Sequence, residues 1–394
     1  MDSLIGAAVP LRFRRLVLHA PGWRFFAACV LLINGTTALS GDLIFADGFE
    51  VSCELDTDND RLSDCLEAVH GTLPTNPDTD GDGLGDGDEV LGTAGGLDLP
   101  AMGVNPRRKD ILVEHDWTHE ATGCAAHSHK PTSTALDALR QIFADAPVVN
   151  DNGQTGINLI NDVGQGGQFT GGNVIAIPNG TIQGDVFGID FANYKAANFA
   201  SNRTGYFHYA IHAHRYSADP GSSGYAEIIG DDLIVTLQCS LIDPFIINTT
   251  MHELGHNLGL LHGGDTSCND KPNYNSIMNY SFQFPGIDTN CDRFGDGPAD
   301  YSVGTRITLN ETSLNESAGV CGDTPIDWNG NGTIENGIQA DINSSGNNSC
   351  GGQFTTLTDF DDWTNMIVDS LPGGPGGGGG ISIGVSCQQT PVLK

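Results

Sequence analysis

The segment His252-Glu253-Leu254-Gly255-His256 constrains the fold of this chain more than any other part of its sequence. Histidines four residues apart lie on one face of an α-helix, so both imidazoles can reach one metal ion, and Glu253 lies beside them. The chain continues through Gly259, which can end the helix in the left-handed conformation, to His262, which can supply a third ligand. A fold that satisfies this pattern places a helix and its following loop around one zinc ion.

Three protein ligands leave one position of the zinc ion open, which is the catalytic rather than the structural arrangement. Zinc lowers the pKa of bound water to about 7, and Glu253 can take the proton as the water attacks a carbonyl. The helix itself is predicted from Asp243 as N-cap, Pro244 in the first turn, and an opposite apolar face of Ile247, Leu254 and Leu258. Histidines that only pack in a core are the alternative, which does not explain so many spaced identities.

A second segment, Ser276-Ile277-Met278-Asn279-Tyr280, follows His262. Together the two segments resemble the metzincin clan of zinc endopeptidases, in its secreted bacterial form. The resemblance implies that Gly259 and Met278 are structural, with Met278 beneath the metal, and that Tyr280 is a catalytic residue able to contact zinc and the oxyanion. It also implies an α+β fold: a twisted mixed sheet with the active-site helix, and then a smaller irregular C-terminal subdomain.

Two acidic windows of identical spacing precede this domain. Their carboxylates are Asp56, Asp58, Asp60, Asp64 and Glu67 in the first window, and Asp78, Asp80, Asp82, Asp86 and Glu89 in the second. Alternate carboxylates on a tightly curled loop converge on one point and need a divalent cation, for which calcium is suited. The segment resembles thrombospondin type 3-like repeats more than EF-hands, because Pro77 stands where an entering helix would lie. A solvated acidic linker is the alternative. A looser window, 327–335, is either another calcium loop or an Asn-Gly turn.

The N-terminus and the cysteines indicate export. Four arginines flank or precede the short apolar run 25–33, which predicts a signal peptide over 1–38 and no membrane span. An oxidising compartment makes disulfides expected, and proximity favours the pairs Cys53–Cys65, Cys268–Cys291 and Cys321–Cys350. The formal net charge of −32 makes nucleic acid a poor partner. We therefore expect a secreted, extracellular protein that is a monomer.

Composition and periodicity divide the remaining chain into three parts. We expect a calcium-binding segment over 39–104, a metzincin-like peptidase domain over 105–370, and a flexible Gly-rich tail over 371–394. Within the domain, the pattern predicts strands within 107–117, 206–212 and 232–237 and an amphipathic helix over 133–145. The family resemblance places an edge strand and its neighbour, with the edge strand binding extended substrate, within 222–237.

These observations favour a secreted zinc endopeptidase that hydrolyses protein or peptide substrates by a zinc-activated water, with Glu253 as general base and calcium as a structural ion. The alternative is a calcium-dependent extracellular adhesive or matrix protein with a non-catalytic peptidase-like domain. Glu253 discriminates between them, since a binding protein has no need of the base. The pairs His127/His129 and His212/His214 could hold a second metal, but ordinary strand alternation is the interpretation we prefer here.

Overall fold

The structure is a computed structural model. It describes residues 53–120, 123–343, 350, 352–369 and 371–372, together with the backbone of short strands at 43–44, 50–51 and 383–386. The chain separates into two units, Met1–Gly41 and Asp42–Lys394. The first unit, and with it the whole predicted signal peptide, lies outside the described residues.

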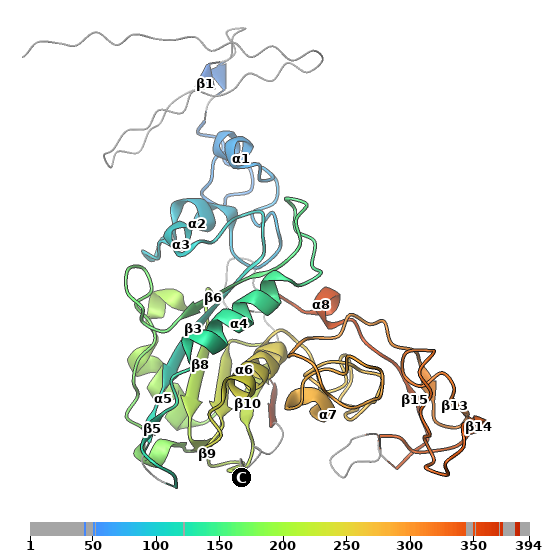
Figure 1. Ribbon diagram of the computed structural model, residues 1–394. Helices are drawn as coiled ribbons and strands as arrows, with labels where there is room; N and C mark the ends of the chain where they lie inside the picture. The colour runs from blue at the N-terminus through green and yellow to red at the C-terminus, as the bar shows by residue number, and fades with distance from the viewer. Residues whose placement is uncertain are drawn as a thin grey trace, which may run out of the picture. The chain divides into compact units, whose positions relative to one another are not determined.

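A mixed sheet forms the centre of the second unit (Figure 1). Five strands from the body of the chain lie in the spatial order β10 (Gly224–Ile228), β11 (Asp232–Thr236), β8 (His208–Ala213), β3 (Asp110–Trp117) and β6 (Asn158–Asp162). The last four are parallel, and β10 runs antiparallel to β11. Every residue of β3 and β8 is buried, as expected of parallel strands covered on both faces.

A sixth strand, β16 (Ile383–Ser386), pairs antiparallel with the outer edge of β10. Its register joins Tyr225 to Ser386 and Ile228 to Ile383. This strand corrects the expectation of a wholly flexible tail, because the β-branched residues after the glycine run favour extended structure. The glycine run itself, 373–380, lies outside the described residues.

Helices pack against both faces of the sheet, and alternate side chains of its strands belong to two different apolar cores. Ile111 and Val113 of β3 belong to the core beneath α4 (Ser133–Ala144) and α6 (Asp243–Asn257). Leu112, which points to the other face, belongs to a second core that includes Phe191 of α5 (Ile189–Asn198). The sheet is therefore buried between two apolar layers.

The N-terminal part of the described chain consists of loops and three short helices. These are α1 (Asp64–His70), α2 (Asp86–Leu91) and α3 (Leu99–Met102). Each acidic window runs into the start of α1 or α2, and each buries one leucine, Leu62 or Leu84. The strands β1 (Leu43–Ile44) and β2 (Glu50–Val51) form a small antiparallel pair.

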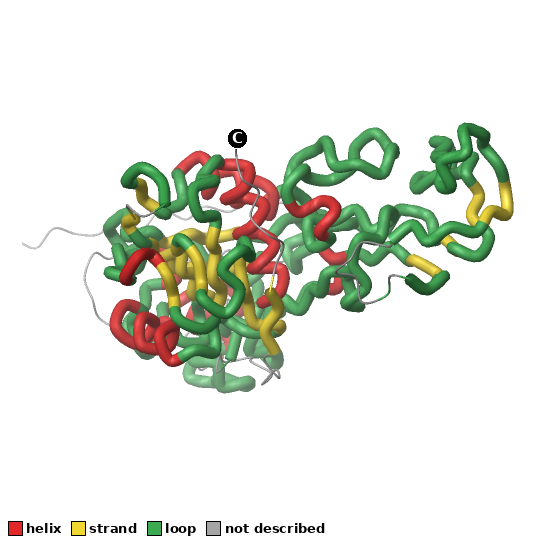
Figure 2. The backbone as a smooth tube through the Cα atoms, turned by 90° about the horizontal axis from the view of Figure 1, so that it is seen from below, coloured by secondary structure: helices red, strands yellow, loops and turns green. Residues whose placement is uncertain are grey.

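Loops make up most of the chain after α6 (Figure 2). The helices there are α7 (Tyr280–Gln283) and α8 (Asp362–Asn365). The strands form two short antiparallel pairs, β12 (Leu309–Asn310) with β15 (Thr356–Leu357), and β13 (Leu314–Asn315) with β14 (Asn336–Ile338). Smaller elements elsewhere are β4 (His119–Glu120), β5 (His127–Ser128), β7 (Thr181–Ile182), β9 (Arg215–Tyr216) and the one-turn helices η1 (Pro178–Gly180) and η2 (Ser201–Arg203).

The predicted strands and the helix over 133–145 are confirmed as β3, β8, β11 and α4, and the architecture is mixed α/β. The predicted disulfides are wrong. Six of the eight described cysteines form disulfides, Cys124–Cys239, Cys268–Cys350 and Cys291–Cys321, because the fold brings together residues far apart in sequence. Three disulfides are consistent with a location outside the cytoplasm. Within the described ranges, no helix combines the length and apolar character that crossing a bilayer requires.

Candidate metal centres

The helix α6 carries the central part of the first centre. Its N-cap is Ile242 rather than the predicted Asp243, which is the first helical residue, and Pro244 lies in the first turn as expected. The carboxylate of Asp243 instead accepts a hydrogen bond from the hydroxyl of Thr132 at 2.6 Å. Because Thr132 caps α4, this bond joins the starts of the two helices that cover one face of the sheet.

The structure brings the three predicted zinc ligands together. His252 and His256 are buried on α6, His262 lies in the loop beyond, and one nitrogen of each lies within 4.8 Å of the others. The Nε2 atoms of His256 and His262 are 3.2 Å apart. Zinc to nitrogen distances of about 2.0–2.1 Å in a tetrahedron give nitrogen separations of roughly 3.3 Å. The geometry therefore fits a shared ion.

Backbone carbonyls orient two of these rings. The Nδ1 of His252 lies 2.7 Å from the Ile277 carbonyl, and the Nδ1 of His256 lies 2.7 Å from the Leu260 carbonyl. A proton donated from Nδ1 leaves the lone pair of Nε2 free for a metal. In the described structure the Nε2 of His252 is buried without a hydrogen-bond partner, which is costly unless an ion occupies the site.

Burial holds all three imidazoles in the neutral form that binds metal. It lowers the pKa of His256 to about 4, and lowers the pKa values of His252 and His262 well below the usual range. The neighbouring histidines lower the last two further. Protons therefore do not compete for these nitrogens near neutral pH.

Gly259 makes the turn that returns His262 to the helix. Its φ of 89° lies in the left-handed region, as predicted, and the next residue, Leu260, donates its backbone N–H to the Gly255 carbonyl at 2.9 Å. The Leu260 carbonyl then accepts the bond from His256. This turn thus ends the helix, orients the His256 ring and brings His262 close to it.

Glu253 is fully buried where α6 meets β10. A side chain at Gly224, the first residue of β10, would collide with the Glu253 carboxylate, so this glycine allows the strand to pass close to it. Leu254 and Leu258 face the core as predicted, and the partly buried Ile247 packs against it. The carboxylate is therefore held between the helix and the antiparallel strand.

Met278 packs against α6. It is fully buried, and a Cβ on Gly255 would come within 2.5 Å of its sulfur. Tyr301 supports the same region, because its hydroxyl donates to the Met251 carbonyl at 2.5 Å. Small and apolar residues thus pack the side of α6 away from solvent.

Tyr280 is the first residue of α7 and lies beside the ligand rings. Its ring centroid is 4.2 Å from that of His262 and 6.0 Å from that of His252. The backbone N–H of Tyr280 donates to the side-chain oxygen of Asn269 at 2.9 Å, which fixes the start of α7. The tyrosine is therefore adjacent to the candidate zinc ligands.

The two acidic windows form loops of the same conformation. In each, the first aspartate, Asp56 or Asp78, accepts backbone N–H bonds from the residues three and five positions later. Those residues have positive φ, including Arg61 at 84° where the second loop has Gly83 at 93°. Arginine therefore adopts the glycine conformation in the first loop, where it also forms an ion pair with Asp88.

Four carboxylates in these loops are buried without a hydrogen-bond partner in the described structure: Asp58, Glu67, Asp80 and Glu89. Burial, reinforced by neighbouring carboxylates, raises the pKa of Glu67 to about 7, of Asp80 to about 8 and of Glu89 to about 12. Buried carboxylates without partners are expensive, so each loop fits a divalent cation. Asp64 and Asp86 are placed differently, since each binds the N–H and hydroxyl of a threonine, Thr57 or Thr79.

Tertiary contacts add residues that the sequence pattern did not identify. Asp110, at the start of β3, lies with Asp82 and Glu89 in one buried acidic group. Its backbone N–H donates to Asp82 at 2.6 Å, and Lys109 donates to the carbonyls of Asp80 and Gly81. The second loop is thereby attached to the central sheet.

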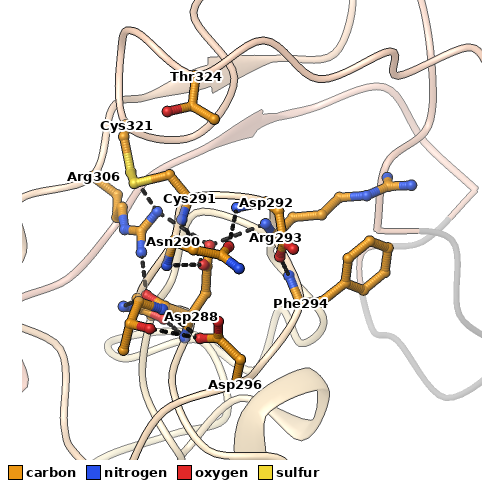
Figure 3. Close-up of polar contacts among 12 residues, drawn as sticks. Asp288, Asn290, Cys291, Asp292, Arg293, Phe294, Asp296, Arg306, Cys321 and Thr324 are labelled. Atoms are coloured by element: carbon orange, nitrogen blue, oxygen red, sulfur yellow. Dashed lines mark hydrogen bonds and ion pairs between the residues drawn. A yellow bond between two sulfur atoms is a disulfide. The ribbon is translucent and has the colours of Figure 1, made fainter.

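Two further loops share the conformation without the full set of carboxylates. In the loop 288–296, which the sequence reading missed, Asp288 accepts N–H bonds from Cys291 and Arg293, and Asp296 binds Thr289 (Figure 3). The looser window begins with Asp327, which accepts bonds from Asn331 and Gly332.

Both loops have asparagine at the third position. At the twelfth position, where the first loops have glutamate, they have Ala299 and Ile338. We therefore assign the cation fit to the first two loops.

The chain matches no protein-family model, and comparison with curated proteins and with solved structures finds no significant match.

Proposed function

We propose that the protein is a secreted zinc-dependent endopeptidase of metzincin type. The observation that carries this proposal is the group of three neutral imidazoles with Glu253 buried beside them. The mixed sheet with its antiparallel strand β10 next to α6, and Met278 packed against the helix, support the same assignment.

The chemistry divides between the ion and the side chains of this chain. When bound by the three imidazoles, zinc supplies Lewis-acid chemistry that acidifies water and polarises a carbonyl. Glu253 accepts a proton on a carboxylate oxygen and returns it to the leaving amine nitrogen. Tyr280, whose ring adjoins that of His262, would donate a hydrogen bond to the oxyanion.

An extended substrate would bind along β10. Gly224, the first residue of this strand, lies against the Glu253 carboxylate, and a peptide paired antiparallel with the outer edge of β10 would pass near it. In this structure β16 pairs with residues 225–228 of that edge. The C-terminal segment and a substrate would therefore compete for the same backbone groups.

Calcium is proposed as a structural ion in the two acidic loops. The unpartnered carboxylates of Asp58 and Glu67 in one loop, and Asp80 and Glu89 in the other, support this. The alternative of an adhesive protein with a non-catalytic domain would also use calcium. It gives no reason for burying a carboxylate beside three metal-binding imidazoles.

Hydrolysis of casein by wild type and Glu253→Gln tests the catalytic assignment. Loss of the base should lower the rate by about 10²–10⁴-fold while zinc remains bound. Asp137→Asn is the matched control, because this exposed carboxylate lies on α4, away from the ligands. Chelation should abolish wild-type activity, and added zinc should restore it. Hydrolysis by zinc-loaded Glu253→Gln at the wild-type rate would overturn the mechanism, and a zinc-loaded wild type without hydrolysis would favour the adhesive alternative.

A further inference from the structure

Three histidines form a second cluster outside the proposed catalytic centre. His127 lies in β5 and His129 just beyond it, whereas His214 follows the end of β8. Their ring centroids are between 4.7 and 5.8 Å apart. His129 and His214 are 3 % and 2 % exposed, whereas His127 is half-buried and gives access from solvent.

The cluster repeats the geometry of the catalytic ligands. The Nε2 atoms of His127 and His129 are 3.1 Å apart, close to the 3.2 Å between His256 and His262. The Nδ1 of His127 lies 2.7 Å from the Ala125 carbonyl, the same arrangement that orients His252 and His256. A proton on that Nδ1 directs the Nε2 lone pair of His127 into the cluster.

The third histidine adds an independent observation that points to a bound ion. The Nδ1 of His214 is buried and has no hydrogen-bond partner in the described structure. Glu120 lies close by, since a Cβ at Gly180 would come within 2.6 Å of its carboxylate and 2.8 Å of the His214 Cβ. The negative charge of Glu120 acts on both His129 and His214, so the cluster contains a group that would offset a cation.

Two other groups near the cluster, Cys124 and His212, have partners elsewhere. Cys124 lies 3.4 Å from His127, but its sulfur is in the disulfide with Cys239 and offers no thiolate. His212 is hydrogen-bonded to His115 at 3.0 Å inside the sheet, so the pattern His212/His214 splits between two environments. Strand alternation accounts for His212, and it does not account for His214.

We propose that His127, His129 and His214 bind a second zinc ion that joins the loop after β3 to the end of β8. Neutral imidazoles are preferred zinc ligands, and the spacing suits a tetrahedral site. The fourth position would be filled by Glu120 or water. The ion would hold together two segments that are far apart in sequence.

Zinc analysis of the full chain tests the proposal. Wild type should hold two zinc ions per chain after dialysis, and His127→Asn and His129→Asn should each hold one. His119→Asn is the matched control, since this exposed histidine in β4 lies outside the cluster and should leave both ions bound. Near-ultraviolet circular dichroism checks that each variant is folded.

Cobalt substitution gives a second measurement that does not depend on activity. The visible absorption of tetrahedral Co²⁺ should fall by about half in His127→Asn and stay unchanged in His119→Asn. Full zinc and cobalt content in folded His127→Asn and His129→Asn would overturn the second site and leave the proposed function intact. If the wild type holds a single ion, and that ion is lost in His129→Asn but retained in His256→Asn, the result would overturn the proposed function instead.

Discussion

Removal of calcium should destabilise the N-terminal loops in a way that depends on pH with a defined sign. Without the ion, burial and neighbouring carboxylates raise the pKa of Asp80 from 3.8 to about 8. The folded ion-free chain then binds a proton at pH 7 that the unfolded chain has released. Stability of the ion-free protein should therefore decrease as pH rises from about 4 to about 8.

The size of this effect follows from Asp80 alone. At pH 7 the carboxylate of the unfolded chain is about three pH units above its pKa, and each unit corresponds to 1.36 kcal/mol. The cost of folding without calcium is thus roughly 4 kcal/mol at this residue. Calcium at 100 times its Kd offsets this cost, because it stabilises the folded chain by about 2.7 kcal/mol at each of the two sites. Together these should lower the melting temperature on chelation by on the order of 10 °C.

Thermal unfolding at several pH values, combined with limited proteolysis of residues 50–95, measures the effect. The calcium-loaded protein should lose stability below about pH 5, whereas the stripped protein should gain it. Because chelators also remove zinc, calcium and zinc are restored separately, and only calcium should recover the melting temperature and the protection from cleavage. An unchanged melting temperature after chelation, or recovery with zinc alone, would refute the assignment of the loops.

Three further predictions concern particular contacts. Arg203→Met should destabilise the fold by about 3–5 kcal/mol in urea unfolding, because it leaves Glu114 and Asp162 buried without the guanidinium that now lies 2.6 Å from each; a loss under 1 kcal/mol would contradict this. Gly224→Ala should displace Glu253 and lower kcat at least tenfold with zinc still bound, and an unchanged kcat would show that β10 does not position the base. Deletion of 381–394 should free the edge of β10 and lower KM for extended peptides severalfold, whereas an unchanged KM would place substrate elsewhere.

Local sequence patterns predicted the elements that depend on local physics. The continuous apolar run at 111–113 and the spacing of Leu136, Leu139 and Phe143 identify β3 and α4, because each pattern matches the period of its element. The order of the strands in the sheet did not follow from any such pattern. Pairing of β3 with both β6 and β8 depends on contacts that link distant parts of the chain.

The candidate sites also divide into those that follow from local sequence and those that depend on contacts between distant parts of the chain. The group of His252, His256 and His262 could be predicted because two of the histidines lie one helical turn apart and Gly259 determines the position of the third. The cluster of His127, His129 and His214 could not be assembled from the sequence, since His214 lies far along the chain from the neighbouring His127 and His129. The loop at 288–296 does repeat the alternate-oxygen pattern with Asp288, Asn290 and Asp292, so a search without the final glutamate would have found it.

The disulfide prediction was wrong for a physical reason that also concerns how the C-terminal part of the chain is held together. Among the described residues, the apolar core of this part has six buried members, which is little to fix so many loops: Leu309, Leu314, Val320, Ile326, Trp328 and Leu357. Cys268–Cys350 and Cys291–Cys321 close long loops around this core and so reduce the entropy of the unfolded chain.

Two buried glutamates also hold the loops of this C-terminal part together. Glu316 accepts backbone N–H bonds from Trp328 and Glu335, and Glu311 accepts them from Ile342 and Thr355. Each carboxylate therefore replaces several hydrogen bonds that a regular sheet would have made. The predicted pairs Cys268–Cys291 and Cys321–Cys350 would close two separate loops, whereas the observed Cys268–Cys350 spans the region and encloses the loop closed by Cys291–Cys321.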